Sequence, residues 1–171
     1  GLELMLRKQE GRFTGLISYT LSRTERLIED ISLNWYPTKY DKTHDVSILG
    51  SYTLTDRWSF GANWVYSTGA AVTMPTGRFE FMGELVPVYS DRNGARMPAY
   101  HRLDLSATLQ GKKNETRKWN GEWVFSIYNA YYRKNPYSIN FVQDKEDPTI
   151  THAEMTYLLP IIPAVTYNFN F

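Results

Sequence analysis

The sequence predicts an all-β protein whose antiparallel strands cross a membrane as part of a β-barrel, and three observations lead to this fold class. Apolar and polar residues alternate with a period of two along most of the chain, and helical periodicity is nearly absent. Lysines fall at the ends of the alternating segments or outside them. Aromatic residues, which make up 15% of the 171 residues, recur near the ends of those segments. Together these features favour strands that face lipid on one side.

Seven segments alternate strongly enough to be predicted as strands of one sheet. They span residues 2–8, 12–21, 45–54, 58–67, 102–110, 122–131 and 161–171. In each segment every second residue belongs to one face, which includes Ile48, Phe60, Leu105 and Ile127. None of the positions on this face is charged, and only Asn129 is plainly polar. The opposite face is rich in Ser, Thr and Asn, so the two sides of the sheet differ in character.

An alternating sheet can belong to a soluble protein or to a membrane barrel. A soluble sheet packs its apolar face on a core and usually carries charged side chains on its polar face. Here all eight lysines lie at strand ends, in turns or in loops. Tyr and Trp collect at membrane–water interfaces, and the aromatics near strand ends include Trp58, Tyr66, Trp123, Tyr131 and Tyr167. We therefore expect the apolar face to contact the lipid bilayer and the polar face to line a lumen.

The connections between the predicted strands alternate between short and long. The short ones are 9–11, 55–57 and 111–121, and the long ones are 22–44, 68–101 and 132–160. Outer-membrane barrels have short periplasmic turns and long external loops, and bacterial single-chain barrels have an even number of strands. Seven strands in this arrangement lead us to expect the C-terminal part of a larger barrel, whose remainder is a partner of these strands. A small self-contained barrel would need an eighth strand within a long connection.

Three motifs, in chain order, resemble those of TonB-dependent outer-membrane receptors. The first is similar to the R-x-P-x-Y-x-R-x-D-L run that opens a late strand in that family, and its residues are Arg96, Pro98, Tyr100, Arg102, Asp104 and Leu105. Residues 125–131, followed by Arg133 and Tyr137, resemble the penultimate strand, which an Asn closes. Residues 165–171 resemble the terminal strand. The resemblance covers essentially the whole chain, as roughly the last third of a barrel of about 22 strands.

The resemblance implies a function and a set of partners. Receptors of this family take up a nutrient by active transport, so it implies the outer membrane of a Gram-negative cell envelope and no enzymatic activity. It also implies a plug inside the barrel and the TonB energy-transducing complex, which such receptors contact through an N-terminal part. The outer-membrane insertion machinery recognises terminal strands of this kind, here through Val165, Tyr167, Phe169 and Phe171. An ordinary edge strand would show the same alternation.

The long connections hold the candidate ligand-binding residues. Residues 78–81 and 84–89 predict a hairpin across Met82-Gly83, and residues 137–142 and 150–158 predict a second one that extends the last two strands beyond the membrane. Aromatic faces beside turn residues can bind sugar rings or peptides. The candidates are Trp35, Tyr36, Phe79, Phe81, Tyr89, Asp91, Arg92 and Asn93. These side chains could instead pack the loops against each other or against a surface lipoprotein. The long aromatic loops resemble those of receptors for glycans or peptides more than those of siderophore receptors.

Other chemistry has little support in the sequence. Cysteine is absent, and the three histidines do not match the spacing of a metal site. The 19 basic and 18 acidic residues give a net charge of +1, which does not favour nucleic acid as a partner. The sequence has no phosphate-binding loop and no nucleophile motif, so we expect no cofactor, metal ion or catalytic residue. The alternatives are an enzyme or adhesin built as a small self-contained outer-membrane barrel, and a soluble lipocalin-like binder.

Overall fold

The computed structural model describes residues 1–112, 120–144, 146–147 and 150–170. These residues form strands joined by turns and loops, with no helix among them, so the predicted all-β class is confirmed. In the same part of the chain no helix is long and apolar enough to cross a membrane. The strands described form one seven-stranded sheet and four two-stranded sheets. Every pairing is antiparallel, as predicted.

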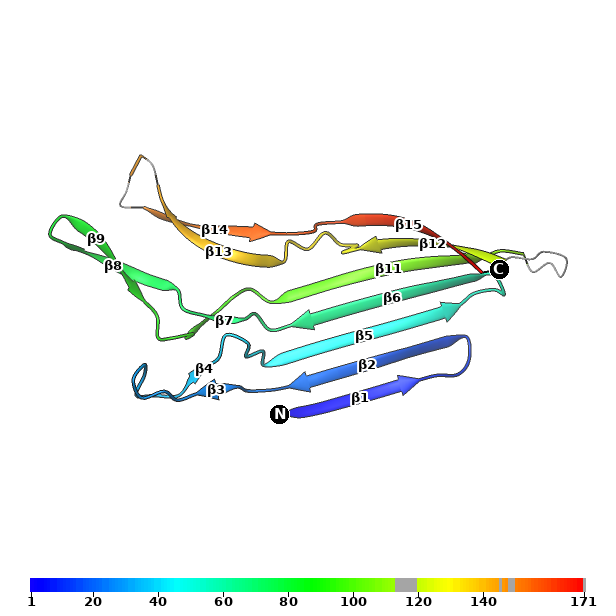
Figure 1. The fold of residues 1–171 in the computed structure, drawn as a ribbon, viewed down its shortest axis with the longest axis horizontal. Helices are drawn as coiled ribbons and strands as arrows, with labels where there is room; N and C mark the ends of the chain where they lie inside the picture. Colours follow the sequence, from blue (N-terminus) through cyan, green and yellow to red (C-terminus); the bar gives the residue numbers. More distant parts are fainter. Residues whose placement is uncertain (113–119, 145, 148–149, 171) are drawn as a thin grey trace.

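The seven-stranded sheet is a meander, in which each strand pairs with the strand of that sheet that follows it in the chain (Figure 1). Its strands in order are β1 Leu2–Lys8, β2 Phe13–Leu21, β5 His44–Thr53, β6 Trp58–Ser67, β11 Tyr100–Gln110, β12 Asn120–Tyr128 and β15 Ile162–Asn170. Two of these coincide with predicted ranges, and the others differ from them by one to three residues at one or both ends. Phe171 lies outside the described residues. The short connections lie at one end of the sheet and the long ones at the other (Figure 1).

The long connections contain strands of their own. The two-stranded sheets pair β3 Glu25–Arg26 with β4 Tyr36–Pro37, β7 Ala71–Val72 with β10 Ala95–Arg96, β8 Pro75–Phe81 with β9 Glu84–Tyr89, and β13 Pro136–Gln143 with β14 Thr151–Tyr157. Both predicted hairpins are confirmed. Met82 and Gly83 have positive φ angles of 53° and 83°, which is the backbone that a two-residue hairpin turn of type I′ requires. The two-residue strands were not predicted, because so short a segment shows no periodicity.

The register of the sheet keeps the two predicted faces apart across strand after strand. Leu105 on β11 lies opposite Ala62 on β6 and Ile127 on β12. The neighbouring residue Ser106 lies opposite Gly61 and Ser126. Directly opposed residues in a sheet point to the same side, so apolar residues form continuous rows on one face. A slip of one residue at any pair would interrupt these rows.

The sheet is a single layer with almost no apolar core. Among the described residues only Tyr36 and Ala71 are buried hydrophobic side chains. On the apolar face Ile48, Leu105 and Ile127 are each about 40% exposed, whereas the serines directly before or after them in the chain are half-buried. The strands β1 and β15 each pair on one side only within the described chain, so the sheet is open. Apolar side chains are normally inside a folded protein, and this face therefore needs a cover.

The strand predicted at 122–131 was wrong at its end, because β12 stops at Tyr128 and Asn129 turns the chain away. Asn129 has a φ of 55°, in the left-handed region that Asn tolerates better than most residues. Its side chain is 1% exposed. Nδ2 donates to the carbonyl oxygens of Arg133 and Pro160, each at 2.9 Å, and Oδ1 accepts from the Arg133 N–H at 2.9 Å. The residue thus holds together the two ends of the long connection between β12 and β15.

We predict that Asn129→Ala lowers the free energy of unfolding by about 3 kcal/mol, because it leaves buried backbone groups without partners and puts a Cβ-bearing residue without a side-chain amide at positive φ. Asn129→Gly should lose the hydrogen bonds but relieve the backbone strain. Asn140→Ala, at an exposed position of β13, is the control. Urea titrations of the full-length protein would measure all three. Equal losses for Asn129→Ala and Asn140→Ala would contradict the prediction.

Candidate functional site

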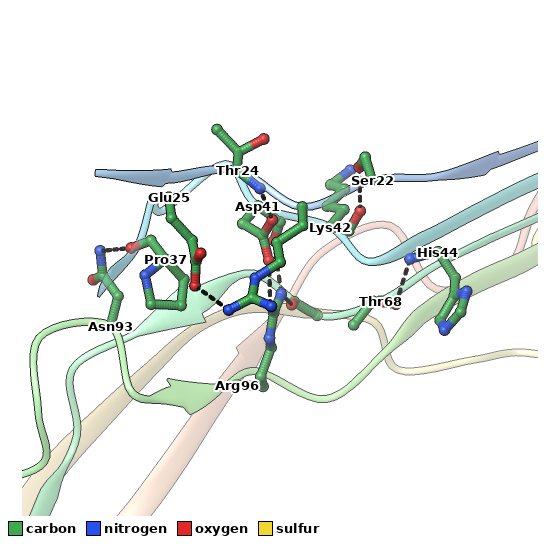
Figure 2. A network of polar contacts seen from close by, with 12 residues as sticks. Ser22, Thr24, Glu25, Pro37, Asp41, Lys42, His44, Thr68, Asn93 and Arg96 are labelled. Atoms are coloured by element: carbon green, nitrogen blue, oxygen red, sulfur yellow. Dashed lines mark hydrogen bonds and ion pairs between the residues drawn. The ribbon is translucent and has the colours of Figure 1, made fainter. Parts of the chain in front are cut away.

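Three connections meet beyond the end of the sheet, and an ion pair between a buried carboxylate and a partly exposed arginine joins two of them. Asp41 is 2% exposed, and its Oδ2 pairs with Nη2 of Arg96 on β10. Nη1 of Arg96 also donates to the carbonyl oxygens of Asp41 at 2.8 Å and Gly69 at 3.3 Å. The other carboxylate oxygen of Asp41 accepts from the Thr24 N–H. Figure 2 shows this network, in which Arg96 reaches from one connection to Asp41 on the other.

A second set of contacts involves residues predicted to bind ligand. Nδ2 of Asn93 donates to the Pro37 carbonyl at 2.8 Å, and its backbone N–H donates to Thr73 Oγ1 at 3.0 Å. The Arg92 guanidinium lies over the Tyr36 ring, 5.3 Å from its centroid. Tyr36 is only 7% exposed. The structure thus brings Tyr36, Arg92 and Asn93 together, in contacts that pack one loop against another.

The other ligand-binding candidates are spread over separate segments. Trp35 is 65% exposed beside β4, and Phe79 and Phe81 are exposed on β8. The carbonyl of Asp91 accepts from the Gly94 N–H at 2.8 Å and so closes a turn. Tyr89 at the end of β9 lines a cavity between two hairpins, which is described below. The eight predicted residues therefore do not form one cluster.

The β8–β9 hairpin, the short β7–β10 sheet and the β13–β14 hairpin extend beyond the same end of the large sheet (Figure 1). One cavity lies beside the β7–β10 sheet and β13, and a second lies between the two hairpins. The first has a volume of about 590 Å³ and the second about 680 Å³, which is the size range of small-ligand sites. The walls of the first include Lys42, Met74, Met97, Tyr100, Ser138 and Ile139. Those of the second include Arg78, Leu85, Pro87, Tyr89, Val142 and Gln143. Phe141 lines both cavities.

Sequence reasoning did not identify the β13 side chains as site residues, although it predicted the hairpin. Tyr137, Ile139 and Phe141 alternate along β13, which was interpreted only as a strand extended beyond the membrane. Their place beside a cavity depends on how the two hairpins approach each other. Nη1 of Arg78 on β8 donates to Oγ1 of Thr151 on β14 at 3.0 Å and links them. No pattern in the sequence predicts a contact between residues as far apart in the chain as Arg78 and Thr151.

The tip of the β13–β14 hairpin is held by a carboxylate. Oδ1 of Asp144 accepts from the backbone N–H groups of Glu146 at 2.8 Å and Asp147 at 3.1 Å, and Oδ2 lies 3.0 Å from Nε2 of His152. The N–H of Glu146, then that of Asp147 and then His152 lower the pKa of the Asp144 carboxyl from its ordinary value. The charged carboxylate is therefore the form that fixes this turn.

Arg102, the second arginine of the motif in residues 96–105, forms a further polar cluster on the polar face of the sheet. Arg102 pairs with Asp104 at 2.8 Å and donates to the hydroxyl oxygens of Tyr100 at 3.0 Å and Tyr128 at 2.6 Å. The Asn129 N–H donates to the other oxygen of Asp104 at 3.0 Å. The alternate residues of the motif thus share one face and join β11 to β12.

The residues predicted to signal membrane insertion lie on the apolar face of β15. Val165 is 61% exposed, Phe169 59% and Tyr167 38%. The Tyr167 ring lies 4.7 Å from that of Trp123, its neighbour on β12. Phe171, the fourth predicted residue, lies outside the described residues. These side chains lie along the open edge of the sheet.

The histidines near the sheet rim contact tyrosines. The hydroxyl of Tyr19 lies 2.9 Å from Nδ1 of His44, and that of Tyr131 lies 2.8 Å from Nδ1 of His101. Within the described ranges no three His, Asp or Glu side chains are grouped so as to hold a metal ion. The two cavities offer apolar side chains, hydroxyl groups and one cation each, Lys42 in the first and Arg78 in the second.

Comparison of the chain with protein-family models, with curated proteins and with solved structures finds no match.

We predict that Gly69→Ala destabilises the connection between β6 and β11, because a Cβ at this position would overlap the carbonyl oxygen of Met97 and lie 2.5 Å from its carbon. One of the two backbone segments would have to move, and overpacking of this kind costs about 1–3 kcal/mol. Gly77→Ala is the matched control, since a Cβ there meets nothing within 4 Å. Denaturant titration of the full-length protein would measure both, and an equal change in the two variants would refute the account.

Proposed function

We propose that this chain belongs to an outer-membrane receptor that takes up a nutrient by TonB-dependent active transport. The observation that carries the proposal is the apolar face of the seven-stranded sheet, which runs in register across neighbouring strands and stays exposed. In our proposal lipid covers this face. The polar face, with the Arg102–Asp104 cluster, then lines the lumen and faces a plug.

Two groups of aromatic residues on the apolar face support a membrane position. Trp58, Trp123 and Tyr167 lie near the end with the short turns, and Trp64 and Tyr66 lie near the end with the long loops. Tyr and Trp at both ends of an apolar band are the pattern of membrane–water interfaces. Six of the seven strands have 9–11 residues, the length that a tilted strand needs to cross a bilayer.

The open edges of the sheet suggest that further strands complete the assembly. The strands β1 and β15 each have one side without a partner strand among the described residues. Unpaired backbone groups cannot face hydrocarbon, so in our proposal further strands pair with both edges and close a barrel of about 22 strands. The insertion machinery would recognise β15 while this edge is still open.

Transport follows in this proposal from the loops and the plug. The two cavities at the outer end hold the nutrient, with or without a surface lipoprotein as a lid. Rearrangement of the plug, driven by the TonB complex, then lets the nutrient pass. In this proposal the receptor acts as a transporter that binds its nutrient and carries out no bond chemistry.

We predict that Ile127→Arg destabilises the barrel by about 2–4 kcal/mol, because the arginine would project into lipid near the bilayer midplane. Ser126→Arg, one residue away, should cost much less because that side chain lies on the opposite face, which lines the lumen. Refolding titrations of the full-length receptor into lipid vesicles would compare the two. Equal losses, or a larger loss for Ser126→Arg, would exclude lipid on the apolar face.

We predict that uptake requires both this protein and the TonB complex. Cells with and without the protein would be supplied with radiolabelled oligopeptides, oligosaccharides or iron chelates. Import of one of these classes should depend on the protein and should fall to background when TonB is deleted. Protein-dependent import that continues without TonB, or dependence on the protein for none of the classes, would argue against an active receptor.

A further inference from the structure

The free edge of β13 runs beside both cavities. Among the described residues β13 pairs with β14 alone, so every second N–H and C=O along its other edge has no strand partner. Residues of the β13–β14 hairpin that line the cavities come almost entirely from β13, and β14 contributes only Thr151. The cavities therefore lie on the side of β13 that faces away from β14.

The pattern of lining residues shows that the cavities lie along the free edge of β13 and not against one of its two faces. Successive side chains of a strand point to opposite faces, so a cavity on one face is lined by every second residue. The strand β9 follows that rule, with Leu85, Pro87 and Tyr89. In contrast β13 contributes the consecutive residues Ser138 and Ile139 to the first cavity and Phe141, Val142 and Gln143 to the second.

The walls favour a ligand that is partly apolar and partly acidic. Of the described lining residues none is Asp or Glu, and each cavity has one cation, Lys42 in the first and Arg78 in the second. Gln143 is the only Asn or Gln side chain among them. Sugars need several planar polar groups to pair with their hydroxyls, so these walls suit an oligosaccharide poorly. Apolar side chains of a ligand would contact Met74 and Met97 in the first cavity and Leu85 and Tyr89 in the second.

We propose that the cavities bind an extended oligopeptide with apolar and acidic side chains, which adds to the free edge of β13 as a further strand. Main-chain hydrogen bonds to β13 supply affinity, and the two pockets, separated by Phe141, select side chains. The segment Ser138–Gln143 would pair with about six peptide residues, or roughly 20 Å of strand. Lys42 and Arg78 attract acidic side chains or the terminal carboxylate. This inference rests on the proposed uptake function and names its substrate class.

The test uses the full-length receptor, immobilised in detergent and exposed to a pool of synthetic hexapeptides. The pool carries Leu, Val, Phe or Pro at odd positions and Glu, Ser or Lys at even positions, and an oligosaccharide pool is run in parallel. Retained molecules are identified by mass spectrometry. Peptides with apolar and acidic residues should be enriched. Phe141→Ala should lower their retention about tenfold, as truncation of a central anchor does. Val88→Ala, at an exposed residue of β9 that lines neither cavity, should leave it unchanged.

N-methylation of a retained peptide tests the strand pairing itself. In an added strand only alternate N–H groups point to β13, so methylation at one set of alternate residues should lower retention at least tenfold, and methylation at the other set should not. Four results would each overturn the inference. The two methylated series could be retained equally, or Phe141→Ala could leave retention unchanged. The receptor could also retain oligosaccharides instead of peptides, or retain no peptide at all. A receptor that binds peptides without TonB-dependent import would contradict only the proposed function. Import of another class of nutrient by a receptor that retains no peptide would contradict only this inference.

Discussion

Backbone hydrogen bonding between neighbouring strands is the interaction on which the rest of this structure depends. The chain buries almost no apolar side chain in its described part, so the hydrophobic core that stabilises most domains is missing. Each strand instead satisfies its N–H and C=O groups through its neighbours in the sheet. The pairing also fixes which side chains share a face, and the separation of apolar from polar residues follows from it.

Outside the sheet, buried polar side chains hold the long connections together, as a hydrophobic core holds the elements of most domains together. The Asp41 carboxylate joins the connection after β2 to Arg96, and the Asn129 amide joins the two ends of the connection between β12 and β15. Both side chains are almost fully buried. A hydrogen bond or ion pair shielded from water is stronger than an exposed one, but loss of a partner is costly because the remaining group stays buried. Loss of either side chain should therefore disturb the loops that it joins.

The sequence allowed the sheet to be predicted closely and the site only in part. Alternation at Leu103, Leu105 and Leu109 is a local signal, and sheet geometry turns it directly into one face of β11. The end of β12 was missed, since an Asn in an alternating run does not reveal that its backbone is left-handed. Tyr36 was predicted from its aromatic character alone, but its contact with Arg92 depends on the path of two loops. Contacts between distant segments, such as that of Arg78 with Thr151, leave no periodic trace.

The meander order of the sheet has a consequence for how the protein folds. Each strand of the large sheet pairs only with the strands that come directly before and after it in that sheet along the chain, so no strand has to be inserted between two that are already paired. Hairpin formation is fast when the connection is short, as between β1 and β2 or between β5 and β6. Closing a longer connection costs only slowly more entropy as its length grows. The sheet can therefore grow by zipping one hairpin onto the next, and at each stage just two strand edges are open to wrong partners.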